Sequence, residues 1–162
     1  MAQYCVSGTF VAAQSFANNI NSNQFAPLIE FVTNPTDQPV ISELGIGFGA
    51  DASNISTNFW LGIAPVAGIG GYLTPNTSGA YDGVSAPAIV NVYNAWQKAP
   101  TTPTHYLRGF RLPNISGLGI APMTLRLGRG LKLAPPQSLV VYGEPGVAFR
   151  PIWGEYWIEF DE

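Results

Sequence analysis

The stretch Val40-Ile-Ser-Glu-Leu-Gly-Ile-Gly-Phe48 decides the fold class. Along an extended chain, one face receives Val40, Ser42, Leu44, Ile46 and Phe48. The other face receives Ile41, Glu43, Gly45 and Gly47. An alternation with a period of two is typical of a half-buried β-strand. We therefore expect a strand over residues 40–48.

Similar segments recur on both sides of this strand. We expect further strands at 28–33, 58–64, 106–112, 123–127, 131–133, 138–142, 147–151 and 155–160. Residues 88–99 fit either a strand or a short helix, and no window of about 11 residues shows a helical stripe. Many short strands separated by Pro- and Asn-rich turns indicate an all-β, antiparallel β-sandwich of jelly-roll type.

The chain is expected to form one globular domain, with a β-sandwich over 28–162 and an N-terminal strand or arm over 1–27. Two alternatives stay open for this arm. Phe10, Phe16 and Phe25 could anchor it across an adjacent subunit, or residues 4–16 could form an ordinary first strand. The Gly-, Pro-, Ser- and Thr-rich residues 65–87 are predicted to be a long loop.

Charge is scarce and unevenly placed. Charged residues make up 10% of the 162 residues, against about 25% in typical globular proteins. We infer that copies of the chain, or a partner, cover part of its surface. All seven basic residues lie in 98–150, whereas the charged residues of 1–97 and 151–162 are all acidic. These segments either neighbour one another within the domain or form complementary patches that meet between subunits.

Several classes of partner are disfavoured. A net charge of −3 and the lack of a dense Lys/Arg cluster argue against nucleic-acid binding. No apolar run approaches about 18 residues, so no membrane partner is expected. The N-terminus has no signal-peptide pattern, which predicts synthesis in the cytoplasm.

The sequence predicts no catalytic residue, metal or cofactor. The single histidine, His105, and the single cysteine, Cys5, lie far apart in the chain without a flanking motif. One His and one Cys cannot form a standard structural zinc site. Residues 45–50 (GIGFGA) match a dinucleotide-binding pattern, but no helical run follows them, so we interpret the glycines as packing positions.

Five segments give the chain a family resemblance across about residues 28–162. They are Ile41-x-Glu43-Leu-Gly-Ile-Gly-Phe, Leu61-Gly-Ile-Ala-Pro65, Trp96-x-x-Ala-Pro100-x-x-Pro103, Tyr106-Leu-Arg-Gly-Phe-Arg-Leu-Pro113 and Gly130-Leu-x-Leu-x-Pro-x-x-Ser-Leu-Val-Val-Tyr142. This pattern resembles small β-sandwich proteins from the structural gene clusters of tailed bacteriophages. The resemblance implies a virion component, such as a capsid decoration (cement) protein or a small tail protein, and it carries over no catalytic residue. An enzyme with a cupin-like or glycosidase-like sandwich is the weakest alternative, because cupin metal sites need several histidines and this chain has one.

The first hypothesis is therefore a decoration protein of the phage capsid that stabilises the head as a symmetric homo-oligomer, expected to be a trimer, bound to the major capsid protein. It would be assembled in the host cytoplasm and reside in the virion. We expect contacts to acidic capsid surfaces from Arg108, Arg111, Arg126 and Arg129, because arginine pairs with carboxylates bidentately.

The second hypothesis is a tail-associated or host-recognition module that binds glycans. Aromatic rings stack on sugars, and Trp60, Tyr72 and Tyr81 lie in or near the predicted 65–87 loop. The alternative for these aromatic residues is that they fill the core and its rim.

Overall fold

A computed structural model describes residues 3–11, 26–33, 36, 38–50, 58–73, 76–80, 90–111, 123–143 and 152–161. These residues contain eleven strands and no helix. The strands are β1 (Gln3–Val11), β2 (Ala26–Thr33), β3 (Val40–Ala50), β4 (Asn58–Ala64), β5 (Ile69–Leu73), β6 (Asn76–Ala80), β7 (Val90–Lys98), β8 (Tyr106–Arg111), β9 (Met123–Lys132), β10 (Ser138–Gly143) and β11 (Ile152–Asp161).

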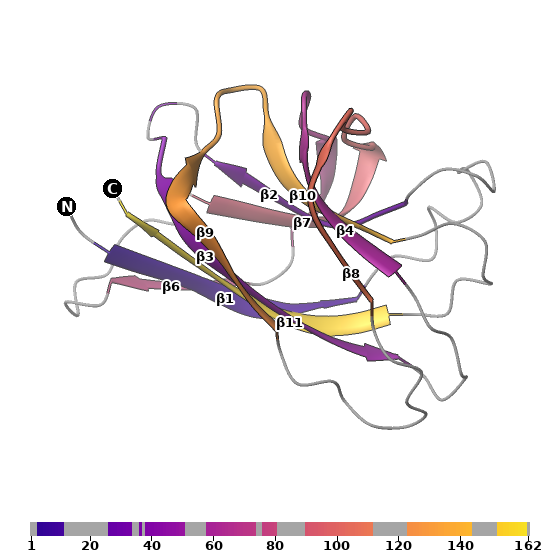
Figure 1. Cartoon of the computed structure of the whole chain (residues 1–162). Coiled ribbons are helices and arrows are strands. Elements are labelled where there is room, and N and C mark those ends of the chain that lie inside the picture. The colour runs from indigo at the N-terminus through magenta and orange to yellow at the C-terminus, as the bar shows by residue number, and fades with distance from the viewer. Residues whose placement is uncertain are drawn as a thin grey trace.

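The strands form two antiparallel sheets that pack face to face (Figure 1). The first sheet has the order β6-β1-β11-β3-β9, and the second has the order β5-β7-β2-β10-β4-β8. The predicted β-sandwich is confirmed.

Eight of the strands pair in a nested series that defines a jelly roll. The pairs are β1 with β11, β2 with β10, β3 with β9, and β4 with β8. The first and third pairs belong to the first sheet, and the second and fourth belong to the second sheet. The nested pairs thus alternate between the two sheets, which is the arrangement of the predicted jelly-roll type.

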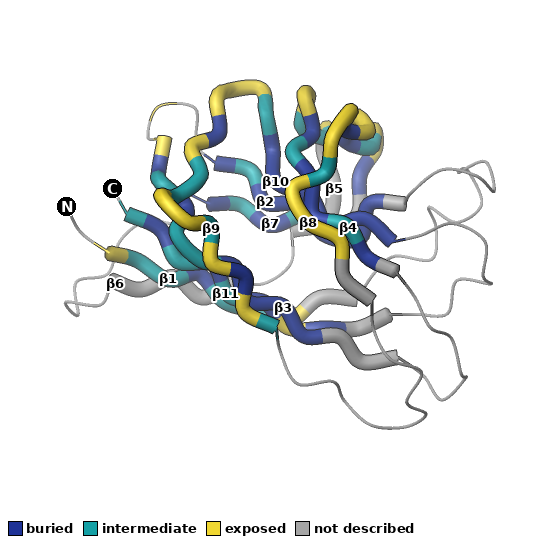
Figure 2. The backbone as a smooth tube through the Cα atoms, in the orientation of Figure 1, coloured by how far each residue is buried: buried dark blue, intermediate teal, exposed yellow. Residues whose placement is uncertain are grey.

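The core lies between the two sheets and follows the sequence alternation. Ile29 and Phe31 of β2 are fully buried there, and Phe31 meets the ring of Tyr156 edge-on at 5.5 Å. Strand β10 is buried along its whole length, because it lies in the centre of its sheet and both of its faces are covered (Figure 2).

Strand β3 departs from the predicted alternation at one point. Ile41, Leu44 and Ile46 all enter the core, so the inward face changes register between positions 41 and 44. The pairing of β3 with β11 shows the cause, since Glu159 pairs with Glu43 and Phe160 pairs with Ile41, which leaves Ser42 without an opposite residue on β11. Ser42 is therefore the extra residue of a β-bulge, and its hydroxyl donates to the carbonyl of Glu159 at 3.2 Å.

The predicted loop over 65–87 is wrong for two of its segments, because β5 and β6 lie within it. With β7, these strands form an excursion between β4 and β8 that extends both sheets. Strand β6 pairs with β1 in the first sheet, and β7 pairs with β2 in the second. Pairing with β2 also decides the ambiguous 88–99 segment in favour of a strand.

The described part of the N-terminal segment is an ordinary strand. Strand β1 pairs with β11 on one side and with β6 on the other, so residues 3–11 belong to the first sheet. The predicted strand over 147–151 lies outside the described residues. The two predicted strands at 123–127 and 131–133 are one strand, β9, which is interrupted by a bulge.

A second apolar cluster covers the outer face of the second sheet and positions β8. It contains Ala64, Val140 and Tyr142, with Trp60 and Tyr106 packed against them. The Tyr106 ring lies 5.6 Å from that of Trp60 and 5.8 Å from that of Tyr142, whose hydroxyl donates to the Thr101 carbonyl at 3.1 Å. Burial raises the pKa of Tyr106 and that of Tyr142, the latter also through nearby Tyr106 and Glu30.

Candidate interaction surface at the open edge

The sandwich has an open side where the edge strand of each sheet faces the other. Strands β8 and β9 are the last strands of their sheets, so each has a hydrogen-bonded neighbour on one side only among the described residues. Exposed positions concentrate on these two strands (Figure 2). An unpaired edge is a template for another strand unless the protein blocks it.

A groove runs between these two edges. Its lining consists of Leu61, Leu107, Arg108, Leu125, Arg126, Leu127, Gly130 and Leu131. We call this the leucine groove. Its volume of about 150 Å³ is below the roughly 300–1,000 Å³ of small-molecule pockets. The groove therefore suits inserted side chains better than a bound metabolite.

The apolar floor of the groove reaches the surface. Leu107 on β8 has 48% of its area exposed, and it is one of three large hydrophobic residues exposed in the described chain. Leu125 on β9 is nearly buried and closes the groove toward the core. A leucine-lined groove that opens to solvent is a surface on which a partner gains hydrophobic burial.

Four exposed cations lie on β8 and β9, and two of them, Arg108 and Arg126, line the groove. The four are Arg108 on β8 and Arg126, Arg129 and Lys132 on β9. Among the described residues, one ion pair joins them to a carboxylate, between Arg126 Nε and Glu43 Oε2 at 3.5 Å. The Arg126 side chain is 87% exposed, so solvent screens this pair and its attraction is weak.

A bulge in β9 presents Arg129. Arg126 pairs with Glu43 and Leu131 pairs with Ile41, so residues 127–130 face a single residue of β3. Gly128 and Gly130 on either side of Arg129 have φ angles of +64° and +89°, which other residues rarely adopt. The bulge interrupts the regular edge of β9 and leaves Arg129 exposed.

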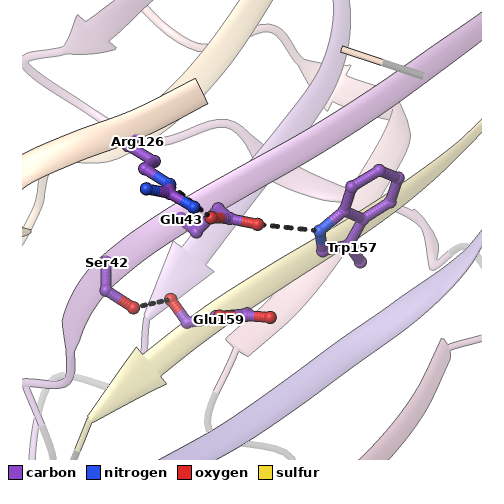
Figure 3. Close-up of polar contacts among 5 residues, drawn as sticks. All are labelled: Ser42, Glu43, Arg126, Trp157 and Glu159. Atoms are coloured by element: carbon purple, nitrogen blue, oxygen red, sulfur yellow. Dashed lines mark hydrogen bonds and ion pairs between the residues drawn. The ribbon is translucent and has the colours of Figure 1, made fainter. Parts of the chain in front are cut away.

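The outer face of the first sheet adjoins this edge through Glu43 (Figure 3). Trp157 of β11 lies across Gly45 of β3, and its Nε1 donates to Glu43 Oε1 at 3.4 Å. Trp157 pairs directly with Gly45, and Glu43 pairs with Glu159. An aromatic ring and several carboxylates therefore share one sheet face next to the basic edge.

The structure gathers some of the predicted interface residues and leaves others apart. Arg108, Arg126 and Arg129 lie on the open side, and Arg108 and Arg126 line the same groove. Arg111 also belongs to β8, whereas Phe10 belongs to β1, which lies inside the first sheet between β6 and β11. Phe16 and Phe25 lie outside the described residues.

The aromatic residues of the glycan-binding hypothesis are placed differently. Trp60 of β4 is half-buried, packs against Tyr106, and covers Gly109 with its six-membered ring. Tyr72 belongs to β5, and Tyr81 lies outside the described residues. Trp157, which the sequence analysis did not single out, is the aromatic residue that lies on a sheet face beside several carboxylates.

The titratable residues considered for chemistry stay apart. His105 is exposed, with its Nδ1 3.1 Å from the hydroxyl of Thr104, and Cys5 is a half-buried residue of β1. No group of three metal-ligating side chains occurs among the residues that the structure describes. In the same part of the chain, no helix is long and apolar enough to cross a membrane.

Sequence reasoning missed the leucine groove, because its residues come from three strands that are distant along the chain. Leu61, Leu107 and Leu127 belong to β4, β8 and β9. The glycines on either side of Arg129 are a signal that could have indicated the bulge, since a G-x-G in a strand often marks one. No family model, curated protein or solved structure matches the chain.

Proposed function

We propose that this protein is a virion structural protein of a tailed phage, a decoration protein that stabilises the head by contacts with its own copies and with the major capsid protein. The observation that carries the proposal is the convergence, on one side of the sandwich, of an apolar groove, four exposed cations and two strand edges with which no further described strand pairs. It would reside on the capsid after assembly in the host cytoplasm.

This open side suits a protein partner of a particular chemistry. The leucine groove accepts one or two apolar side chains, and Arg108 and Arg126 at its rim attract carboxylates. The outer edges of β8 and of β9 on either side of its bulge pair with no further described strand, and they offer backbone hydrogen bonds to an extended segment. The best-fitting ligand is therefore an extended acidic segment with large apolar side chains, supplied by the capsid shell.

Two further features support a structural role. Jelly rolls recur in viral capsid proteins. The chain also has only 17 charged residues among 162, which favours a molecule whose surface is partly covered in its working state. A decoration protein works by this burial alone, since each subunit that bridges neighbouring shell proteins adds to the free energy that holds the shell closed.

The test is occupancy on purified expanded heads of the phage that encodes the protein, measured by co-sedimentation, with the solution mass from light scattering. We expect the wild-type oligomer to pellet with the heads. Arg108→Glu and Leu107→Ser should each reduce the apparent affinity by about ten-fold or more, because one reverses a rim charge and the other removes apolar contact.

Lys98→Glu is the matched control. Lys98 is exposed on β7, in the second sheet but away from the groove, and the substitution makes the same change in net charge as Arg108→Glu. Its occupancy should equal that of wild type. A wild-type protein that stays in the supernatant, or groove variants that bind as well as Lys98→Glu, would contradict the proposal.

A further inference from the structure

We infer that β8 is the edge to which an extended segment of the partner adds as a further strand, and that Arg108 selects segments with a carboxylate at the position opposite it. The inference rests on the proposed function and deepens it, because it names the strand and the residue that recognise the segment. The occupant to which it commits is a segment of the major capsid protein.

The outer edge of β8 is regular over residues 108–111. Each of these residues pairs with one residue of β4, beginning with Arg108 opposite Leu61. Leu107, Arg108 and Gly109 are exposed, and no further described strand pairs with β8. A regular edge of this kind can form backbone hydrogen bonds with a strand of another chain.

The opposite wall of the leucine groove is less suitable for strand addition. Strand β9 lines the groove with residues between positions 125 and 131. The bulge over residues 127–130 lies within this stretch and faces Ser42 alone on β3. Gly128 and Gly130 have positive φ angles, so the backbone there is not that of an extended strand. An added strand therefore finds a continuous partner on β8 and an interrupted one on β9.

Strand β8 has a bulge of its own, which directs two neighbouring side chains into the groove. Arg108 pairs with Leu61 and Tyr106 pairs with Gly62, so Leu107 has no opposite residue on β4. Successive residues of a regular strand point to opposite faces, yet Leu107 and Arg108 both line the groove. An added strand therefore meets an apolar and a cationic side chain next to each other.

Arg108 stands on the inward face of this edge strand. Its pairing partner Leu61 is 1% exposed and belongs to the core, and residues directly opposite each other on neighbouring strands lie on the same face. No ion pair joins Arg108 to a carboxylate of the described residues. An inward charge disfavours a strand with an apolar or basic residue opposite it, whereas a carboxylate there pairs with the guanidinium bidentately.

The edge strands of this chain do not supply such a carboxylate. The outermost strands of the two sheets are β6, β9, β5 and β8. Their sequences, NTSGA, MTLRLGRGLK, IGGYL and YLRGFR, contain no aspartate or glutamate. Addition of β8 or β9 from a second copy would also bring arginines together, which is destabilising. These charges favour an acidic segment of a different protein as the occupant.

The geometry also fixes the pattern of that segment. Because side chains alternate along a strand, the residues two positions on either side of the carboxylate share its face. That face points into the leucine groove, whose lining includes Leu61, Leu107 and Leu127. The segment therefore has a carboxylate with large apolar side chains two residues before and after it.

The probe is a fluorescently labelled peptide of about nine residues in which leucine and threonine alternate and glutamate replaces the central leucine. Its sequence reads the same in both directions, so it fits parallel or antiparallel addition. By fluorescence anisotropy, wild-type protein should bind it about ten-fold or more tightly than the same peptide with a central lysine. Arg108→Glu should reverse this preference. Lys98→Glu makes the same change in net charge at an exposed position of β7 and should keep the preference of wild type.

Methylation of single backbone nitrogens tests whether the peptide adds as a strand. Along an added strand, the N–H groups of alternate residues point to the neighbouring strand. Methylation within one alternating set should weaken binding by about ten-fold or more, and methylation within the other set should weaken it much less. An equal effect at all positions, or no effect at any, would overturn the strand addition.

Hydrogen exchange on protein bound to purified expanded heads identifies the occupant. Those amides of residues 108–111 that do not bond to β4 should exchange about ten-fold or more slowly than in the free protein. Slow exchange already in the free protein would assign the edge to a second copy and would overturn the choice of occupant. Exchange on the heads at the rate of the free protein would overturn the role of β8.

A preference for glutamate over lysine that Arg108→Glu leaves unchanged would overturn the role of Arg108. Circular dichroism and thermal unfolding establish that this variant is folded. If it is not, Arg108→Gln replaces it and should bind the two peptides about equally. Failure of the proposed function looks different, since wild-type protein would then stay in the supernatant of the heads whatever the peptides show.

Discussion

Replacing Gly45 by alanine tests how strongly the first sheet depends on the placement of Trp157. The new Cβ would lie 1.8 Å from Trp157 Cε2 and 2.1 Å from Cζ2. The indole must therefore move by about 1.6 Å to reach ordinary van der Waals contact. Because three atoms of the indole lie within 2.2 Å of the new Cβ, the ring must lift or rotate away from β3, and either movement uncovers the part of the ring that rests on Gly45.

The expected cost follows from the area of the covered face. A buried tryptophan covers about 150–250 Å², so one face is roughly 100 Å² and contributes about 2.5 kcal/mol at 25 cal/mol per Å². Losing the long hydrogen bond to Glu43 costs about 0.5 kcal/mol, and replacing a strand glycine by alanine returns about the same amount. We predict that Gly45→Ala lowers the free energy of unfolding by about 2.5 kcal/mol.

A double-mutant cycle with Trp157→Ala isolates this contact. Urea unfolding at 25 °C, followed by circular dichroism, gives the free energy of each variant. In the Trp157→Ala background, Gly45→Ala should be neutral or stabilising by about 0.5 kcal/mol, since nothing remains for the methyl group to displace. An equal loss in both backgrounds would refute the reasoning, because the cost would then come from the backbone rather than from the indole.

Three further predictions concern stability and are checked by the same urea titrations. Trp96→Phe should cost about 1–3 kcal/mol, because it removes the indole donor that hydrogen-bonds to the fully buried carboxylate of Glu30; a loss below 0.5 kcal/mol would contradict this role. Gly130→Ala should cost more than Gly128→Ala, because both positions have positive φ but a Cβ collides with a neighbouring side chain only at 130; strain alone predicts about 1 kcal/mol at 128. Burial raises the pKa of Tyr156 to about 12, so the folded state holds this proton more tightly than the unfolded state, and stability should fall as the pH rises from about 10 toward 12. Tyr156→Phe should reduce the loss of stability between pH 10 and 12. At neutral pH it should raise the free energy of unfolding by about 1 kcal/mol, since the buried hydroxyl has no hydrogen-bond partner in the described structure. An unchanged dependence of stability on pH would contradict the raised pKa of Tyr156.

The sequence predicted the strands of the sandwich well where alternation was strong. The predicted strand over 58–64 coincides with β4, and that over 40–48 covers most of β3. The faces of β3 were less predictable, because one bulge at Ser42 changes the register and sends Ile41 into the core. A bulge depends on the partner strand, and a single-strand pattern contains no information about it.

The excursion between β4 and β8 shows a second limit. Strands β5 and β6 are five residues each and rich in Gly, Thr and Ser, so local propensity favours a loop there. They form strands because the edges of β7 and β1 supply hydrogen-bond partners. Their existence is a property of the assembled sheets and not of their own residues.

Of the candidate interaction surface, the sequence predicted only the basic residues. The sequence predicted contacts from Arg108, Arg111, Arg126 and Arg129, and the fold places Arg108, Arg126 and Arg129 on the two strands of the open side. The leucines between them could not be paired from sequence, because the approach of β8 to β9 depends on how the two sheets stack. Trp157 could not be distinguished in the sequence from the other aromatic residues of the last strand. Its place on the sheet face follows only from its pairing with Gly45 of β3.

The place of β11 in the sheet has a consequence for how the protein is made. Strand β11 lies between β1 and β3 and pairs with both. The first sheet therefore cannot form as one sheet until residue 161 has been synthesised and has left the ribosome. One edge of β1 can pair earlier with β6, but its other edge must wait for β11, about 150 residues further along the chain, and until then it is open to neighbouring nascent chains. We expect folding to be slow, and deletion of β11 to yield an aggregating chain rather than a smaller sandwich.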